Sequence, residues 1–200
     1  MRGFKNRFGP TSEIGVFEMK AEGLISAKDI SSKFFSRTNA QPGSALTVIM
    51  EGSRPIILEV QALVSDSHAP NPKRQATGFE NNRLNMLLAL LERKLEIPLN
   101  QYDVFINITG GIKITETSAD LAILAAIISS FRNRAISKET IFVGEVSLVG
   151  DVREVFQLDA RLKEASLHKF SKALIAKKPS DTFGLKCYEV NEVTKLIDWM

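Results

Sequence analysis

The segment at residues 118–128 (SADLAILAAII) carries apolar side chains on nearly every face that a helix would present. It is rich in alanine and longer than a typical strand, so it predicts a buried α-helix. Such a helix has to be enclosed by other elements, and a chain of 200 residues is long enough to bury a core of that size.

Several short runs of β-branched and other apolar residues predict strands around this helix. The runs at residues 45–50 and 55–64 flank a glycine-containing turn, which predicts a β-hairpin. A second hairpin is expected from residues 141–148 and 152–155, around Gly150. Further strands are expected at residues 14–19, 102–108, 112–115, 172–176 and 185–190.

Leucine spacing predicts the clearest amphipathic helix. Leu84, Leu87, Leu88, Leu91 and Leu95 fall at i, i+3, i+4, i+7 and i+11. Shorter helices are expected at residues 27–35, 158–168 and 193–200, and the polar, proline-rich residues 65–78 predict a mobile surface loop. Helices interleaved with frequent hairpins indicate an α+β (mixed α/β) fold, with helices packed on a mixed sheet.

Composition limits the chemistry. The net charge of +3 is compatible with an anionic partner without requiring one. Cys187 is the only cysteine, which excludes an intramolecular disulfide and a cysteine-based zinc site, and we expect no metal. The sequence contains no Gly-Lys dipeptide and therefore no phosphate-binding loop of the G-x-x-x-x-G-K-[ST] type. Without a signal peptide or a bilayer-length apolar run, we expect a soluble cytoplasmic protein with no membrane partner.

Three stretches together resemble the RadA (Sms) family of bacterial DNA-repair proteins. They are KNRFGPTSEIGVFEM at residues 5–19, GGIKITETSADLAILAAIISSFRNR at residues 110–134 and VGEVSLVGDVREVFQLDARLKEA at residues 143–165. The motif Lys5-Asn6-Arg7-Phe8-Gly9 is the signature of that family. The similarity extends from about residue 5 to residue 200.

The resemblance implies a division of the chain into two parts. Residues 1–12 would be a basic arm that carries the KNRFG motif, at the end of a RecA-like ATPase region. Residues 13–200 would have the fold of the Lon protease catalytic domain, within the ribosomal-protein-like β-α-β superfamily. Complete family members also carry a zinc module and an ATPase that uses ATP and Mg²⁺, so we expect this chain to be a fragment, or the product of a split or decayed gene, with no cofactor of its own.

The KNRFG motif suggests a role in ATP hydrolysis across a subunit boundary. The resemblance implies that Lys5 and Arg7 reach toward nucleotide held by a neighbouring subunit. A cation placed there would stabilise charge on the transferred phosphoryl group, as an arginine finger does.

The resemblance to Lon also raises the question of peptidase activity. Ser118 occupies the position of the nucleophile in a serine–lysine dyad. The lysine position aligns with Asp159, and Phe156 and Gln157 replace the two glycines that precede it. Lys163 lies one helical turn beyond Asp159 and could reach the same face, but its acidic neighbour would disfavour a role as the base. We therefore interpret Ser118 as the vestigial position of a nucleophile, in the first turn of a helix that Thr117 and Asp120 would cap. An active peptidase is the alternative.

The resemblance implies a scaffold that binds DNA within a larger machine. Complete members are understood as hexameric ATP-driven motors in the processing and branch migration of recombination intermediates. Single-stranded or branched DNA, further copies of the chain and a recombinase are the expected partners. The candidate DNA contacts are Lys73, Arg74, Arg83 and Lys113. A solvated loop without DNA contacts, and a remnant without function, are the alternatives.

Overall fold

The computed structural model describes residues 17–20, 23–26, 31, 34–36 and 39–199. The arm at residues 1–12, the KNRFG motif and most of the helix expected at residues 27–35 lie outside these residues. A two-stranded antiparallel sheet, β1 (Phe17–Lys20) and β2 (Gly23–Ser26), is the first described element and overlaps the strand expected at 14–19.

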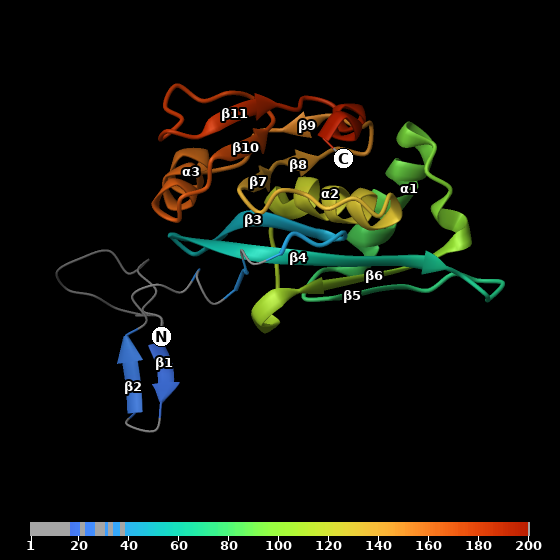
Figure 1. Ribbon diagram of the computed structural model, residues 1–200, viewed down its shortest axis with the longest axis horizontal. Helices are drawn as coiled ribbons and strands as arrows, with labels where there is room; N and C mark the ends of the chain where they lie inside the picture. Colours follow the sequence, from blue (N-terminus) through green and yellow to red (C-terminus); the bar gives the residue numbers. More distant parts are fainter. Residues whose placement is uncertain (1–16, 21–22, 27–30, 32–33, 37–38, 200) are drawn as a thin grey trace.

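A seven-stranded mixed sheet forms the centre of the protein (Figure 1). Its strands in spatial order are β11 (Lys186–Glu189), β10 (Lys172–Ile175), β7 (Thr140–Val143), β3 (Ser44–Glu51), β4 (Arg54–Asp66), β6 (Tyr102–Ile108) and β5 (Arg74–Thr77). The pairs β3–β4 and β4–β6 are antiparallel, and the other pairs are parallel. The expected mixed sheet with packed helices is therefore confirmed.

The hairpin β3–β4 follows the sequence prediction. The two strands pair from Ser44 opposite Gln61 to Glu51 opposite Arg54. Side chains alternate between the two faces of the sheet, so each strand contributes to two separate hydrophobic clusters. In β4, for example, Leu58 belongs to the larger cluster and Ile57 to the smaller one.

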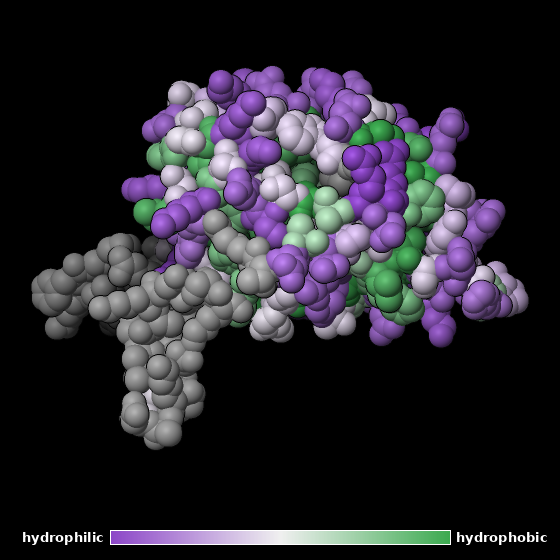
Figure 2. Space-filling model, viewed as in Figure 1, coloured by the Kyte–Doolittle hydropathy of each residue, from purple (hydrophilic) through white to green (hydrophobic). Residues whose placement is uncertain are grey.

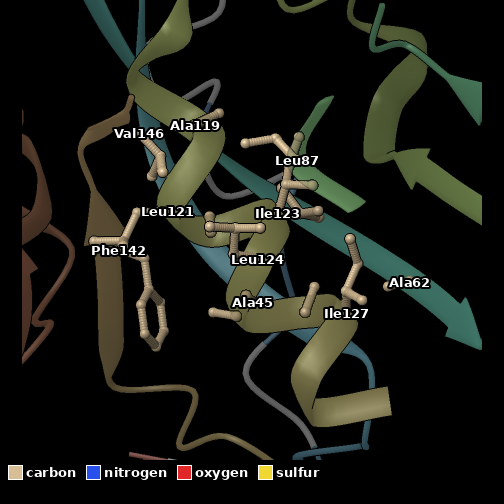
Figure 3. Packing of buried hydrophobic residues seen from close by; sticks show 14 of the residues in the cluster. Ala45, Ala62, Leu87, Ala119, Leu121, Ile123, Leu124, Ile127, Phe142 and Val146 are labelled. Atoms are coloured by element: carbon tan, nitrogen blue, oxygen red, sulfur yellow. The ribbon is translucent and has the colours of Figure 1, made fainter. Parts of the chain in front are cut away.

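The larger cluster surrounds helix α2 (Asp120–Phe131), the buried helix that the sequence predicts. The short 3₁₀ helix η4 (Thr117–Ala119) precedes it. Figure 3 shows α2 side chains between residues of β3, β4, β7 and α1. The labelled residues are Ala45, Ala62, Leu87, Ala119, Leu121, Ile123, Leu124, Ile127, Phe142 and Val146. Because α2 is enclosed on all sides, almost all of its residues can be apolar.

Helix α1 (Asn81–Leu95) also packs on the larger cluster, through the leucines that the sequence analysis identifies. Its N-terminus is capped by Glu80, whose carboxylate accepts hydrogen bonds from the backbone N–H groups of Asn82 (2.9 Å) and Arg83 (2.6 Å). Helix α3 (Leu158–Leu167) packs on the smaller cluster through Leu162 and Ala165. The two clusters therefore place α1 and α2 on one face of the sheet and α3 on the other.

Two expected elements are wrong, and a third is a helix of another type. Residues 74–77, within the expected surface loop, form the edge strand β5, which pairs in parallel with β6. Residues 112–115 form no strand; the N–H of Ile114 donates instead to the carbonyl of Gly78 (2.8 Å). The helix expected at residues 193–200 is present as a 3₁₀ helix, η5 (Val193–Trp199).

The second expected hairpin is shorter than its sequence suggests. Its strands are β8 (Glu145–Val146) and β9 (Val152–Arg153), while residues 140–143 join the central sheet as β7. Two further 3₁₀ turns, η2 (Leu99–Gln101) and η3 (Thr109–Gly111), flank β6.

On the surface, apolar side chains form separate patches among polar ones on the face that Figure 2 shows. Within the described residues, none of the helices combines the length and the hydrophobicity that crossing a bilayer requires.

Candidate functional site

Ser118 lies in a buried polar network at the junction of η4, β3 and α3. Its hydroxyl donates a hydrogen bond to Glu116 Oε1 (2.6 Å) and accepts one from Arg161 Nη1 (2.9 Å). Arg161 also donates to both carboxylate oxygens of Glu116, at 2.8 Å each, and to the carbonyl of Val48 at 2.6 Å. The Arg161 side chain is only 1% exposed, so this guanidinium replaces water as the environment of Ser118.

The groups that contact Ser118 are not those that activate a serine nucleophile. A serine needs a neighbouring base that can take its proton, and an arginine guanidinium stays protonated in proteins. Burial by itself would raise the pKa of Glu116, but hydrogen bonds from Arg161 and Ser118 hold that pKa below its usual value. Glu116 therefore accepts the serine hydrogen bond as a carboxylate that is a poor base.

The α3 residue that contacts Ser118 is neither Asp159 nor Lys163 but Arg161. Asp159 and Lys163 are exposed, and neither is a hydrogen-bond partner of Ser118. Arg161 is two positions from each, and residues two apart on a helix do not share a face. One signal in the sequence could have pointed to Arg161. It falls on the same side of α3 as three apolar residues, with the i, i+3, i+4, i+7 spacing of Leu158, Arg161, Leu162 and Ala165.

The expected cap of α2 by Thr117 and Asp120 is wrong. The N-cap residue is Ala119, and no side chain caps the helix. Thr117 Oγ1 instead donates to Glu145 Oε2 (2.9 Å). Asp120 is fully buried and accepts hydrogen bonds from the backbone N–H of Val146 (3.0 Å) and from Arg83.

Arg83, a candidate DNA contact, is bound within the protein. Its guanidinium makes a two-pronged hydrogen-bonded ion pair with Asp120 and also donates to the carbonyl of Val146 (2.6 Å). The hydrogen bonds with Asp120 raise the pKa of Arg83, whereas burial raises the pKa of Asp120 more than Arg83 lowers it. Arg83 thus links α1, α2 and the hairpin β8–β9.

The other three candidate DNA contacts differ in their surroundings. Arg74 Nη2 pairs with Glu92 Oε1 on α1 (3.1 Å), so part of its charge is already matched. Lys113 is exposed and lines a pocket of about 330 Å³ together with Arg83. Lys73 is exposed directly before β5, where its backbone N–H donates to Asp103 Oδ1 (2.7 Å).

A second buried charge cluster was not anticipated from the sequence. Lys138 Nζ lies 2.7 Å from Glu59 Oε1 and 2.6 Å from Ser44 Oγ, and Ser44 Oγ donates to the same Glu59 oxygen over 2.5 Å. Burial would raise the pKa of Glu59, but the hydrogen bonds from Lys138 and Ser44 bring it below its usual value. The cluster resembles a serine–lysine pair, but the Lys138 amine is hydrogen-bonded to the Glu59 carboxylate as well as to Ser44, so Ser44 is not its only partner.

Neither network suggests a metal site. Among the residues that the structure describes, no group of three or more histidine, cysteine, aspartate or glutamate side chains is arranged to hold a metal ion. Lys5, Asn6, Arg7, Phe8 and Gly9 lie outside the described residues.

The chain is similar over its whole length to proteins named DNA repair protein RadA. It is 62% identical to the one from Campylobacter jejuni and 60% identical to one from Helicobacter pylori, in both cases over 100% of this chain. It is 44% identical to the one from Escherichia coli over 88% of the chain. The chain covers 44%, 45% and 38% of these relatives, so it spans less than half of their length.

A protein family also matches the part of the chain that contains Arg83, Ser118 and Arg161. The match runs over residues 74–179, from β5 to just beyond β10, and the family is described as subunit ChlI of Mg-chelatase. Because the match covers more than half of the sequence, the chain belongs to this family.

Proposed function

We propose that this chain is the Lon-protease-like part of a RadA-type DNA-repair protein and that it acts as a non-proteolytic scaffold for oligomerisation and DNA binding. Whole-length similarity to proteins named DNA repair protein RadA supports the repair role. The complete protein would use ATP and Mg²⁺ in the cytoplasm to process recombination intermediates as a hexameric ring.

The observation that carries the non-proteolytic part is the Arg161 guanidinium at Ser118. A serine–lysine peptidase needs a neutral amine at that place. Here the hydroxyl lies between a permanent cation and the carboxylate of Glu116. The active-peptidase alternative would require both groups to move away.

Backbone geometry supports a relationship to the Lon fold. Gln157 adopts φ 55° and ψ 42° just before α3, a left-handed conformation that glycine favours. Gln157 is one of the two positions at which the peptidase pattern has glycine. The chain thus keeps a glycine-like turn while the residues that would support catalysis are replaced.

For DNA binding, the contacts of the four basic residues favour Lys73 and Lys113. Arg83 and Arg74 are hydrogen-bonded to Asp120 and Glu92, whereas Lys73 and Lys113 are exposed. Phosphate contacts need accessible cations. We infer that Lys73 and Lys113 contact the DNA backbone and that Arg83 maintains the fold.

The test is a titration of fluorescently labelled single-stranded and branched DNA with the chain, read by anisotropy at several salt concentrations. Lys73→Glu and Lys113→Glu should each weaken binding and flatten its salt dependence. Lys163→Glu is the matched control, because Lys163 is also exposed but lies on α3. Equal binding by all four proteins would refute these contacts. Light scattering during size-exclusion chromatography tests assembly: a hexamer supports the scaffold, and a strict monomer would show that this chain alone does not assemble.

A further inference from the structure

The strands β4, β6 and β5 present an open face on the side of the sheet opposite α1 and α2. Side chains of a strand alternate between faces. Ala62, Ile106 and Ala76 point into the larger hydrophobic cluster, and their neighbours in sequence point to the other side. Helix α3 packs against this other side only near β3 and the first half of β4, where it contacts Ile57. Glu59, the next residue of β4 on this side, is also buried, whereas Gln61 and Leu63 of β4, Asn107 of β6, and Gln75 and Thr77 of β5 are exposed.

Strand register places the exposed side chains in two rows across the three strands. The first row has Phe105 at its centre, with Leu63 opposite it on β4 and Gln75 opposite it on β5. Leu63 is 59% exposed and Phe105 is half-buried, so the row offers an apolar centre to solvent.

The second row consists of polar, uncharged side chains. Asn107 lies at its centre, between Gln61 on β4 and Thr77 on β5. Asn107 Nδ2 donates to Gln61 Oε1 (3.0 Å), which holds both amides in place while leaving donors and acceptors unused. The two rows line a shallow pocket of about 370 Å³. We call the surface that these two rows of side chains form the β4–β6–β5 face.

The size of this face favours a small occupant. Three strands about 4.8 Å apart and two rows about 7 Å apart span roughly 10 by 7 Å. A standard protein–protein interface buries about 800 Å² on each partner, far more than this surface supplies. A second copy of the chain would therefore need a much larger surface than these six residues provide.

We propose that the β4–β6–β5 face holds two or three unpaired bases of a single-stranded nucleic acid, with one base stacked on Phe105. This inference rests on the DNA binding proposed above and assigns it a second site beside Lys73. An aromatic ring on an open sheet is a stacking platform for any base, and amide and hydroxyl side chains can hydrogen-bond to base edges. Paired bases in a duplex cannot reach such a platform.

The charges beside the face limit how the strand can lie. Asp103 borders the Phe105 row, and its pKa is lowered by the hydrogen bond from the Lys73 backbone, so it is ionised at neutral pH. Lys73 lies next to it and supplies the cation. We expect the bases to cover Phe105 and the phosphates to follow the β5 edge, away from Asp103. With one bordering cation, this site contributes about −0.7 to the salt slope of single-strand binding.

The test compares three oligonucleotides by anisotropy: a labelled oligothymidine, the same length with abasic sites in the middle, and a hairpin duplex. Phe105→Leu should weaken oligothymidine binding by about tenfold, as expected for the loss of one base stack, and leave duplex binding unchanged. Phe105→Tyr keeps the ring and should retain affinity. Phe156→Leu is the matched control, because Phe156 is 79% exposed but precedes α3. Thermal unfolding confirms that each variant is folded.

The outcomes separate this inference from the proposed function. If Phe105→Leu binds like the wild type while Lys73→Glu binds more weakly, the base-binding face is refuted and the DNA scaffold stands. If the wild type binds no DNA, both are refuted. If the abasic oligonucleotide binds as well as oligothymidine, stacking plays no part and the inference fails. If Leu63→Glu converts an oligomer to monomers, the face takes a second copy and the inference is overturned.

Discussion

Arg161 Nη1 lies 2.9 Å from the Oγ atom of Ser118, deep between α3 and the start of α2. The same guanidinium forms a two-pronged pair with Glu116, so one buried cation orders the hydroxyl, the carboxylate and the Val48 carbonyl of β3. The site resembles a catalytic one in its position before a buried helix. Its chemistry is that of a structural clamp between α3 and the sheet.

The first prediction concerns the stability of this clamp. Arg161→Met should lower the free energy of unfolding by about 3 kcal/mol, because it leaves the largely buried Glu116 carboxylate without its cation. Chemical denaturation followed by circular dichroism measures the change. The control, Lys163→Met, removes an exposed cation from the same helix and should change the stability by less than about 0.5 kcal/mol. Adding Glu116→Gln to Arg161→Met should restore part of the loss; equal stabilities for the two single variants would contradict the clamp.

The second prediction concerns the pH dependence of the Lys138–Glu59 pair. The pKa of Glu59 lies below its ordinary value of 4.5 in the folded protein, so the folded state binds its proton less readily than the unfolded state. The stabilisation is therefore complete above about pH 4.5 and is lost as the pH falls through the lowered pKa. In the variant Glu59→Gln/Lys138→Met, the melting temperature should depend less steeply on pH between pH 5 and 3 than in the wild type. Parallel curves would show that this pair does not couple folding to protonation.

The third prediction separates folding from DNA binding among the basic residues. Arg83→Met should destabilise the protein by about 3 to 5 kcal/mol, because the buried Asp120 carboxylate would lose its cation and keep only the hydrogen bond from the Val146 N–H. Lys73→Met should change the stability by less than about 0.5 kcal/mol but weaken DNA binding. Denaturation midpoints and anisotropy titrations on the same preparations measure both quantities. A stable Arg83→Met protein with weakened DNA binding would reverse the two assignments.

The fourth prediction concerns ATP hydrolysis. The chain alone should release no phosphate from ATP, because it contains no phosphate-binding loop. In a longer protein that includes an ATPase region followed by this chain, Lys5→Ala should reduce phosphate release, since Lys5 is proposed to contact nucleotide on a neighbouring subunit. Phosphate release by this chain alone, or unchanged release by the longer Lys5→Ala protein, would count against the proposal.

Helices and strands could be predicted from the sequence where the spacing of apolar residues fits only one type of secondary structure. The leucines of α1 repeat with the spacing of a helix, and β-branched residues are frequent in β3 and β4, as in strands. The structure has all three elements. Strand β5 was missed because its four residues are mostly polar and follow a proline-rich segment. Only pairing with β6, far along the chain, makes that segment a strand.

The polar networks could be predicted only in part. Ser118 was identified through the resemblance to Lon, but its partner Arg161 is 43 residues away, on the buried side of another helix. Glu59, Lys138 and Ser44 carry no local pattern, because three separate segments bring them together. Arg83 appeared to be a free cation until the fold placed Asp120 beside it.

The most direct test of a scaffold without peptidase activity is labelling by a serine-reactive phosphonate, read by mass spectrometry of the intact protein and its peptides. An active serine–lysine peptidase in a parallel reaction confirms that the reagent is effective, and Ser118→Ala serves as the blank. The clamp predicts that the reagent adds no mass at position 118 in the wild type, just as in Ser118→Ala, because Arg161 and Glu116 occupy the serine hydroxyl. A phosphonate adduct on Ser118 in the wild type would contradict the account.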